Sequence, residues 1–318
     1  MRLGLTLSAC LFGATAVLAD PLPSWENTET KTAIIAFVEE VSDPTSESYV
    51  TPADRIATFD NDGTLWAEQP LYFQVIYALD RLKEKAAADP SILTSDALRA
   101  AAEGDMKAVA SAGKQGLLEI LAVTHSGMSV EDFQNDVRLW LASARHPTTG
   151  KPYDEMVYQP MLELLSYLRD NEFQTWIVSG GGIHFIRAFA KEAYNIPPEQ
   201  VIGSTTPTEY VDGAVIKSPG IDFVDDRAGK PIGIDSRIGK RPIFVGGNSD
   251  GDFEMLEYAF AGDGPRFGLL VHHTDSEREF AYDREGHIGV LNRGLDEGPE
   301  RGWVIIDMAA DWRRIWPE

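Results

Sequence analysis

The sequence predicts an α/β fold in which a doubly wound parallel sheet forms the core and an all-helical segment is inserted into it. Short apolar runs followed by helical patterns occur once before residue 67 and repeatedly after residue 150. Such alternation is typical of parallel sheets covered by helices on both faces. Between residues 67 and 150 apolar residues recur at helical spacing, and no strand is predicted. We therefore expect residues 20–66 and 151–318 to form the core and residues 67–150 a helical cap.

The predicted elements follow one another in a simple order. A leading helix is expected over 28–42, and the apolar run 55–59 forms the first strand. In the inserted segment Leu71, Val75 and Leu79 lie on one helix face. The later predictions are a helix at 160–168, a strand at 175–178, a helix at 184–194, a hairpin at 208–217, a strand at 243–245 followed by a helix through 260, a strand at 267–271 and a helix beginning at 274–276.

Residues 1–19 have the pattern of a secretory signal peptide. Arg2 provides a positive start, residues 3–17 are almost wholly apolar or small, and Ala19 ends a cleavage pattern that leaves Asp20 first in the mature chain. The apolar run is too short for a permanent membrane helix, and a lipid anchor on Cys10 would leave even less apolar sequence before it. We therefore expect a periplasmic or secreted protein.

Composition limits the partners of the mature chain. Cys10 is the only cysteine, so no disulfide is expected after signal cleavage, and a hydrophobic core must stabilise the fold. The formal net charge is −22 and no basic stripe is present, which argues against nucleic acid. No later apolar run is long enough to cross a membrane. Because the chain is acidic, an anionic ligand would need local cations. The sequence indicates no particular oligomeric state.

The segment from Asp60 to Thr64 carries the strongest chemical signal. Asp60 directly follows a buried strand, where a carboxylate can attack phosphorus, and Asp62 can protonate a leaving oxygen from the same side. Gly63 allows a sharp turn. A calcium loop would need glycine at position six and glutamate at position twelve, whereas here the glycine is fourth and Leu71 is twelfth. A plain Asp-Gly turn is the other alternative for this segment alone.

Three further segments complete the predicted site. Ser179, Gly180 and Gly181 end a strand and open a helix, so a hydroxyl and backbone N–H groups can face an anion. Lys230 can balance phosphoryl charge and hold the nucleophile. The loop 248–252 supplies hard oxygen ligands that suit magnesium. Because the carboxyl ends of parallel strands meet at one edge, these segments are expected to lie together there.

Together the four segments resemble the motifs of the haloacid dehalogenase (HAD) superfamily, and the resemblance covers the whole mature chain. The phrases at 157–161, 178–182 and 247–252 are also similar to an exported bacterial subgroup that resembles phosphoserine phosphatases. The resemblance implies an aspartyl-phosphate on Asp60, with Asp62 as acid and base, Ser179 and Lys230 as phosphoryl contacts, and Mg²⁺ bound by Asp60, the Asp62 carbonyl and the final loop.

One position departs from the family pattern, and one is a substrate candidate. The family usually has an aspartate where this chain has Asn248. Either the Asn248 amide oxygen binds the metal, or Asp250 or Asp252 supplies the carboxylate; the favoured set is Asn248 with Asp252. Glu68 lies at the cap entrance, near where phosphoserine phosphatases carry a glutamate that contacts the substrate's amino group. A packing or solvated role for Glu68 is the alternative.

The expected activity is hydrolysis of a small phosphorylated metabolite. A halide leaving group needs no proton, so Asp62 argues against a dehalogenase. A phosphomutase would use the same two carboxylates, but an exported enzyme meets few sugar phosphates. A non-catalytic phosphate- and metal-binding protein would not need both Asp60 and Asp62 against an anion. The predicted function is therefore a magnesium-dependent phosphomonoester hydrolase.

Overall fold

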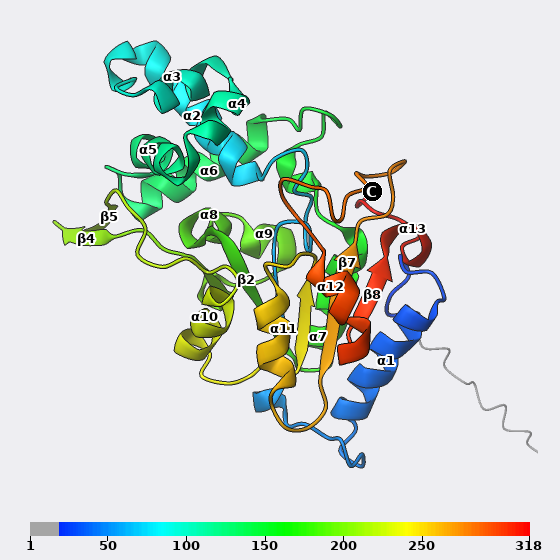
Figure 1. Ribbon diagram of the computed structural model, residues 1–318. Helices are drawn as coiled ribbons and strands as arrows, with labels where there is room; N and C mark the ends of the chain where they lie inside the picture. The colour runs from blue at the N-terminus through cyan, green and yellow to red at the C-terminus, as the bar shows by residue number, and fades with distance from the viewer. Residues whose placement is uncertain (1–18) are drawn as a thin grey trace, which may run out of the picture.

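The computed structural model describes residues 19–318 (Figure 1). Except for Ala19, the predicted signal peptide lies outside the described residues. The core is a six-stranded sheet in the order β3-β2-β1-β6-β7-β8, and every neighbouring pair is parallel. Its strands are β1 (Ile56–Phe59), β2 (Gln174–Gly182), β3 (Val201–Ser204), β6 (Phe244–Gly247), β7 (Phe267–His272) and β8 (Val304–Asp307). The predicted α/β class is confirmed.

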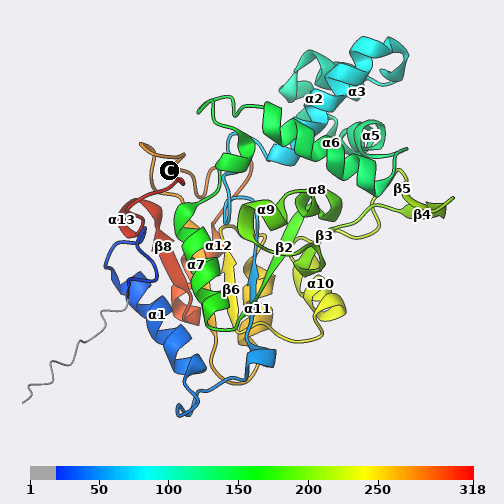
Figure 2. The same cartoon turned by 180° about the vertical axis from the view of Figure 1, so that it is seen from behind.

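Helices cover both faces of this sheet, as a doubly wound fold requires. One face packs against α1 (Glu29–Ser42), α7 (Gln159–Asp170), α8 (Ile183–Arg187) and α9 (Ala190–Tyr194), and the other against α10 (Gly229–Arg237) and α11 (Phe253–Phe260) (Figures 1 and 2). Successive strand residues point to opposite faces, so Phe244 belongs to the first core and Val245 to the second. Both cores consist of buried side chains.

The chain between β1 and α7 is helical. It contains α2 (Phe73–Ala88), α3 (Asp96–Glu103), α4 (Met106–Ser111), α5 (Gly113–His125) and α6 (Val130–Ser143), which we call the cap helices. A small core that includes Leu79, Leu82 and Leu98 holds them together. None of the helices in residues 19–318 has the length and apolar character needed to cross a membrane.

A two-stranded hairpin extends from the core toward the cap helices (Figure 2). It consists of β4 (Thr208–Val211) and β5 (Ala214–Lys217), which pair antiparallel around Asp212 and Gly213. Both turn residues have positive φ, which Asp tolerates and Gly adopts freely. The base of β5 is fixed to the turn between α5 and α6, because the Gly127 N–H donates to the Lys217 carbonyl at 2.8 Å. The predicted hairpin is confirmed.

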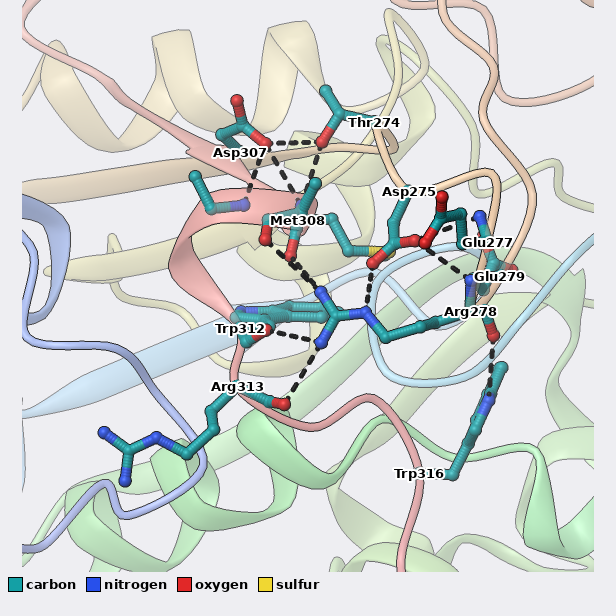
Figure 3. Close-up of polar contacts among 12 residues, drawn as sticks. Thr274, Asp275, Glu277, Arg278, Glu279, Asp307, Met308, Trp312, Arg313 and Trp316 are labelled. Atoms are coloured by element: carbon teal, nitrogen blue, oxygen red, sulfur yellow. Dashed lines mark hydrogen bonds and ion pairs between the residues drawn. The ribbon is translucent and has the colours of Figure 1, made fainter.

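The segment after β7 differs from its prediction. Residues 274–276 start a turn rather than a helix. The Asp275 carboxylate accepts from the backbone N–H of Arg278 at 2.9 Å and also pairs with its guanidinium (Figure 3). Arg278 then reaches α13 (Met308–Asp311), where it donates to the carbonyls of Trp312 at 2.8 Å and Met308 at 3.4 Å. The guanidinium thus binds carbonyls at the helix C-terminus and ties the loop after β7 to the last helix.

Candidate active site

The predicted site residues lie at the carboxyl ends of the central strands. Asp60 follows β1 directly, Ser179 lies in the last part of β2, and Asn248 follows β6. β1 pairs with β2 on one side and with β6 on the other, so these three positions are neighbours. The Asp60 N–H donates to the Gly246 carbonyl at 2.9 Å, which continues the pairing of β1 with β6 to the nucleophile position.

A buried ion-pair cluster lies at the centre of the site. Lys230 extends from α10, and its ammonium is 2.8 Å from Asp60 Oδ1 and 2.5 Å from Asp252 Oδ1. The same ammonium donates to the Val178 carbonyl at 3.0 Å, so all three of its donors are used. Lys230 is 1% exposed and Asp252 is fully buried. The lysine predicted to hold the nucleophile therefore contacts it directly.

The carboxyl groups of the site outnumber its cation. Burial and the neighbouring Asp252 raise the pKa of Asp60 to about 8, although Lys230 opposes the shift. Burial raises the pKa of Asp62 to about 6, and burial followed by the charges of Asp62 and Asp60 raises the pKa of Glu68 well above its usual range. Among the described residues, Lys230 forms ion pairs with two of these four carboxyl groups, Asp60 and Asp252, so Asp62 and Glu68 gain no ion pair from it.

Asp62 is oriented by the indole of Trp66. The Trp66 Nε1–H donates to Asp62 Oδ1 at 2.8 Å, and the indole is fully buried against Phe73 and Phe189. This hydrogen bond favours the ionised carboxylate, while burial favours the protonated acid. The balance gives a pKa of about 6, which suits a group that must give and take a proton near neutral pH.

The glycine-rich end of β2 faces the same cavity but is partly occupied by its own hydrogen bonds. The Ser179 hydroxyl accepts from the Gly181 N–H at 3.1 Å, and the Gly182 N–H donates to the Gln74 side chain of α2 at 2.7 Å. Ser179, Gly180 and Gly181 all line the cavity. Their predicted contacts with a phosphoryl group stay a prediction, and Gln74 links this loop to the cap helices.

Asn248 is held by residues of the loop that follows β1, residues 60–68, which we call the nucleophile loop. Its Nδ2 donates to Glu68 Oε1 at 2.8 Å, and its Oδ1 accepts from the Thr64 hydroxyl at 3.1 Å. The Tyr282 hydroxyl also donates to Glu68 Oε1 at 2.8 Å. A Cβ on Gly63 would lie 2.0 Å from Asn248 Nδ2, so only glycine fits there. Glu68 therefore orients the amide of Asn248, and its predicted substrate contact stays a prediction.

The two aspartates of the final loop have different surroundings. Asp252 Oδ2 accepts from the N–H groups of Asn248 and Ser249, each at 3.0 Å, so this carboxylate joins the loop to Lys230. The Asp250 carboxylate instead accepts from backbone N–H groups of residues 292–294 at the start of α12 (Arg293–Glu297). Of the three alternatives for the last metal ligand, Asp250 is thus occupied elsewhere.

The donor set fits a divalent cation of the magnesium type. In residues 19–318 no three His, Cys, Asp or Glu side chains form a metal-binding group by themselves. A site here would therefore combine the Asp60 carboxylate with oxygens of other kinds, such as the Asp62 carbonyl and the Asn248 amide oxygen. Magnesium prefers oxygen ligands and retains several waters, so a small protein ligand set suffices for it.

A cavity of about 400 Å³ opens onto these residues. Asp60, Asp62, Glu68, Ser179 and Lys230 form its floor, and apolar side chains of the cap helices, with His125 and Phe133, form much of its wall. A phosphate bound at Asp60 would therefore place the organic part of its ester against the cap helices. The arrangement offers a nucleophile, an acid and a cation at the floor of one cavity.

Several residues around the site were not predicted. Gln74 and Lys217 line the cavity, and Tyr282 and His273 contact the nucleophile loop, with His273 Nε2 2.8 Å from the Gly63 carbonyl. No local motif marks these residues, and the fold brings them to the site from separate segments. The one visible signal in the sequence is the pair His272 and His273 at the end of β7, and the structure gives His273 a backbone contact.

The fold and site define a doubly wound α/β protein with a strand-end aspartate as candidate nucleophile. The family model for haloacid dehalogenase-like hydrolases matches residues 57–257, so the chain belongs to that family. This segment runs from β1 into α11 and contains all the predicted site residues. A comparison with curated proteins yields no match.

The chain is similar to several solved structures. A functionally unknown protein from Anaerococcus prevotii DSM 20548 is 16% identical, with a TM-score of 0.52 over 77% of this chain and 86% of its own. A protein of unknown function from Bordetella pertussis Tohama I is 18% identical, with a TM-score of 0.51 over 80% of this chain and 98% of its own. A phosphoserine phosphohydrolase-like protein from Francisella tularensis subsp. tularensis SCHU S4 is 18% identical, with a TM-score of 0.40 over 77% of this chain and 98% of its own.

Proposed function

We propose that the protein is an exported, magnesium-dependent phosphomonoester hydrolase that acts on a small phosphorylated metabolite through an aspartyl-phosphate on Asp60. The observation that carries the proposal is the contact of Asp60 with Lys230 at the floor of a cavity that also contains Asp62. Asp60 has the position of a nucleophile, Asp62 the pKa of an acid, and Lys230 the charge that a phosphoryl group needs. Export rests on the signal pattern of residues 1–19.

The proposed reaction has two steps. A carboxylate oxygen of Asp60 attacks phosphorus, the bond to the ester oxygen breaks, and Asp62 gives its proton to that oxygen. Asp62 then takes a proton from water, whose oxygen attacks phosphorus and breaks the bond to Asp60. Lys230 keeps the Asp60 carboxylate in place throughout. Bound magnesium would neutralise phosphoryl charge and favour the ionised form of Asp60.

Chelation is expected to abolish phosphate release. Burial, followed by the charge of Asp252, keeps the pKa of Asp60 near 8 without a metal, so the nucleophile is mostly protonated at pH 7. Phosphate release from an aryl phosphate should stop with excess chelator and return when magnesium is added back. Full activity in chelator would contradict the magnesium assignment. Transfer of the phosphate to a second position of a sugar, without release, would favour a phosphomutase. Binding of the phosphate ester without turnover would favour a non-catalytic binding protein.

Asp62→Asn should reduce turnover most for esters with poor leaving groups. An alkyl alkoxide must be protonated as it leaves, whereas nitrophenolate needs little protonation. In the unmodified protein, kcat/KM for alkyl phosphates should fall as pH rises through about 6, because Asp62 must be protonated for the first step. Measured from pH 5 to 8, nitrophenyl phosphate should show a weaker fall. Equal losses on both substrates in D62N would refute the acid role.

Asn248→Asp should tighten magnesium binding most when Glu68 is also neutralised. A carboxylate binds magnesium more strongly than an amide oxygen, but here it would lie beside Glu68, whose Oε1 is 2.8 Å from Asn248 Nδ2. We expect N248D/E68Q to lower the magnesium Kd by about tenfold, or about 1.4 kcal/mol. N248D alone should change it less. Titration calorimetry measures this without turnover.

Asp250→Asn is the matched control for that experiment. Its carboxylate accepts from backbone N–H groups of residues 292–294, so the change should lower the melting temperature and leave the magnesium Kd unchanged. If D250N alone removes magnesium binding, Asp250 is the ligand and the assignment to Asn248 is wrong. Asp252→Asn should disturb both the loop and Lys230, because Asp252 contacts both.

A further inference from the structure

Lys217 is a buried cation that lines the proposed active-site cavity. It is the last residue of β5, and it is 4% exposed. Its ammonium contacts His184 Nδ1 and the Thr206 hydroxyl, each at 3.1 Å, and lies 4.6 Å from the centre of the Phe133 ring. Within residues 19–318 no carboxylate forms an ion pair with it. A buried charge without a counter-ion is costly, and such charges are ordinarily paired.

The groups around Lys217 do not supply the missing negative charge. Burial, followed by the charge of Lys217, lowers the pKa of His125 to about 3 and that of His184 to about 4, so both imidazoles are neutral at pH 7. Burial alone lowers the pKa of Lys217 to about 8, which still leaves the ammonium mostly charged at that pH. The cavity therefore has one cation at its acidic floor, Lys230, and a second against the cap helices.

The position of Lys217 is fixed by backbone contacts on two sides. The Lys217 N–H donates to the Met128 carbonyl at 2.9 Å, and the Lys217 carbonyl accepts from the Gly127 N–H at 2.8 Å. These bonds attach the end of the hairpin to the turn between α5 and α6. Apolar side chains make up much of the lining of the cavity, among them Val75, Leu79, Ile120, Leu121 and Ile221.

We propose that Lys217 binds a second anionic group of the substrate. The preferred ester then has its phosphate at Asp60, an apolar body against the cap helices, and a carboxylate or similar anion at Lys217. This inference rests on the proposed phosphatase function and adds the substrate class. The two-cation arrangement selects against phosphate esters whose organic part is uncharged, because such an ester would leave the buried ammonium of Lys217 unpaired.

The experiment compares ω-carboxyalkyl phosphates with their methyl esters over a range of chain lengths. These substrates share phosphate and leaving group, and they differ in charge only at the far end. In the unmodified protein, kcat/KM should favour the free carboxylate by about tenfold or more at one preferred length, the scale of a hydrogen bond to a charged group. Lys217→Met should bring the ratio of the two kcat/KM values close to one, and Lys217→Arg should retain part of the preference.

Lys240→Met is the matched control. Lys240 is half exposed and pairs with Asp54 at 2.7 Å, away from the cavity lining, so its loss should leave the preference unchanged. If K217M reduces kcat/KM equally for the carboxylate and the methyl ester, Lys217 only attaches the hairpin, and the inference fails. Thermal melting shows whether K217M folds. Should it not fold, the unmodified protein decides the matter through the ratio of kcat/KM for the free carboxylate to that for its methyl ester. A peak of this ratio at one chain length supports the inference, and a ratio near one at every length overturns it.

The two proposals fail in different ways. Phosphate release without any preference for the carboxylate would overturn the second anion site and leave the phosphatase function intact. An absence of phosphate release from every ester, with magnesium present and the protein folded, would overturn the phosphatase function itself.

Discussion

Asp60→Asn should remove turnover while the protein stays folded. The amide keeps the shape of the side chain and an oxygen for Lys230, but it cannot form an acyl phosphate. Loss of a nucleophile typically costs about 10⁴-fold or more in kcat, so phosphate release should fall to background. Single-turnover assays with radiolabelled ester should likewise show no labelled protein. Retention of more than about one per cent of activity would assign the nucleophile elsewhere.

The stability of the same variant tests the surroundings of Asp60. Its pKa is raised from 3.8 to about 8, chiefly by burial, so the folded state binds a proton that the unfolded chain releases. This carboxyl group therefore costs stability increasingly as pH rises from about 4 to about 8. D60N removes that cost, and its melting temperature at pH 8 should equal or exceed that of the unmodified protein. A lower value at pH 8 would show that the ion pair with Lys230 outweighs the burial of Asp60.

Lys230→Met should have the largest effect on stability. The methionine fills a similar volume, but it leaves the carboxylates of Asp60 and Asp252 buried without their cation. Removal of one partner from a buried ion pair costs about 3–5 kcal/mol. For a domain of this size that corresponds to a fall in melting temperature on the order of 10 °C. Activity should also be lost, and the fall should lessen at lower pH as the carboxyl groups take up protons.

A second substitution separates charge from packing. K230M/D252N removes one of the unpaired carboxylates, so part of the lost stability should return without any recovery of activity. Lys240→Met, at an exposed ion pair, should change the free energy of unfolding by less than about 1 kcal/mol. If K230M and K230M/D252N melt at the same temperature, the loss in K230M comes from packing rather than from unpaired charge.

The parts of the fold that follow local patterns were predictable from sequence. β1, β6 and β7 are short apolar runs that lie in the centre of the sheet, and each was predicted within a residue or two. β8 was not predicted, because it is a four-residue edge strand with partly exposed positions. The predicted helix at 184–194 is divided into α8 and α9, and β2 extends through Gly182.

In the site, too, some positions follow from patterns in the sequence, and others depend on contacts with distant segments. Asp60 and Lys230 were predicted as partners, because the order of motifs along the chain already implied their meeting. The direction of Asp250 was not predictable, because it depends on backbone N–H groups more than forty residues later in the chain. Lys217 likewise acquires its position from the turn at Gly127 and Met128, which no pattern around Lys217 itself indicates.

The strand order also determines when the site can form during synthesis. β1 lies between β2 and β6, so the strand that ends at Asp60 lacks one neighbour until residues 244–247 have left the ribosome. Tyr282, which contacts Glu68, lies in a loop that Arg278 ties to α13 near the end of the chain (Figure 3). Pairing of such distant segments is slow and waits for the later one. A growing chain will therefore have its nucleophile long before it has a working active site, and hydrolysis should begin only once these later segments have paired.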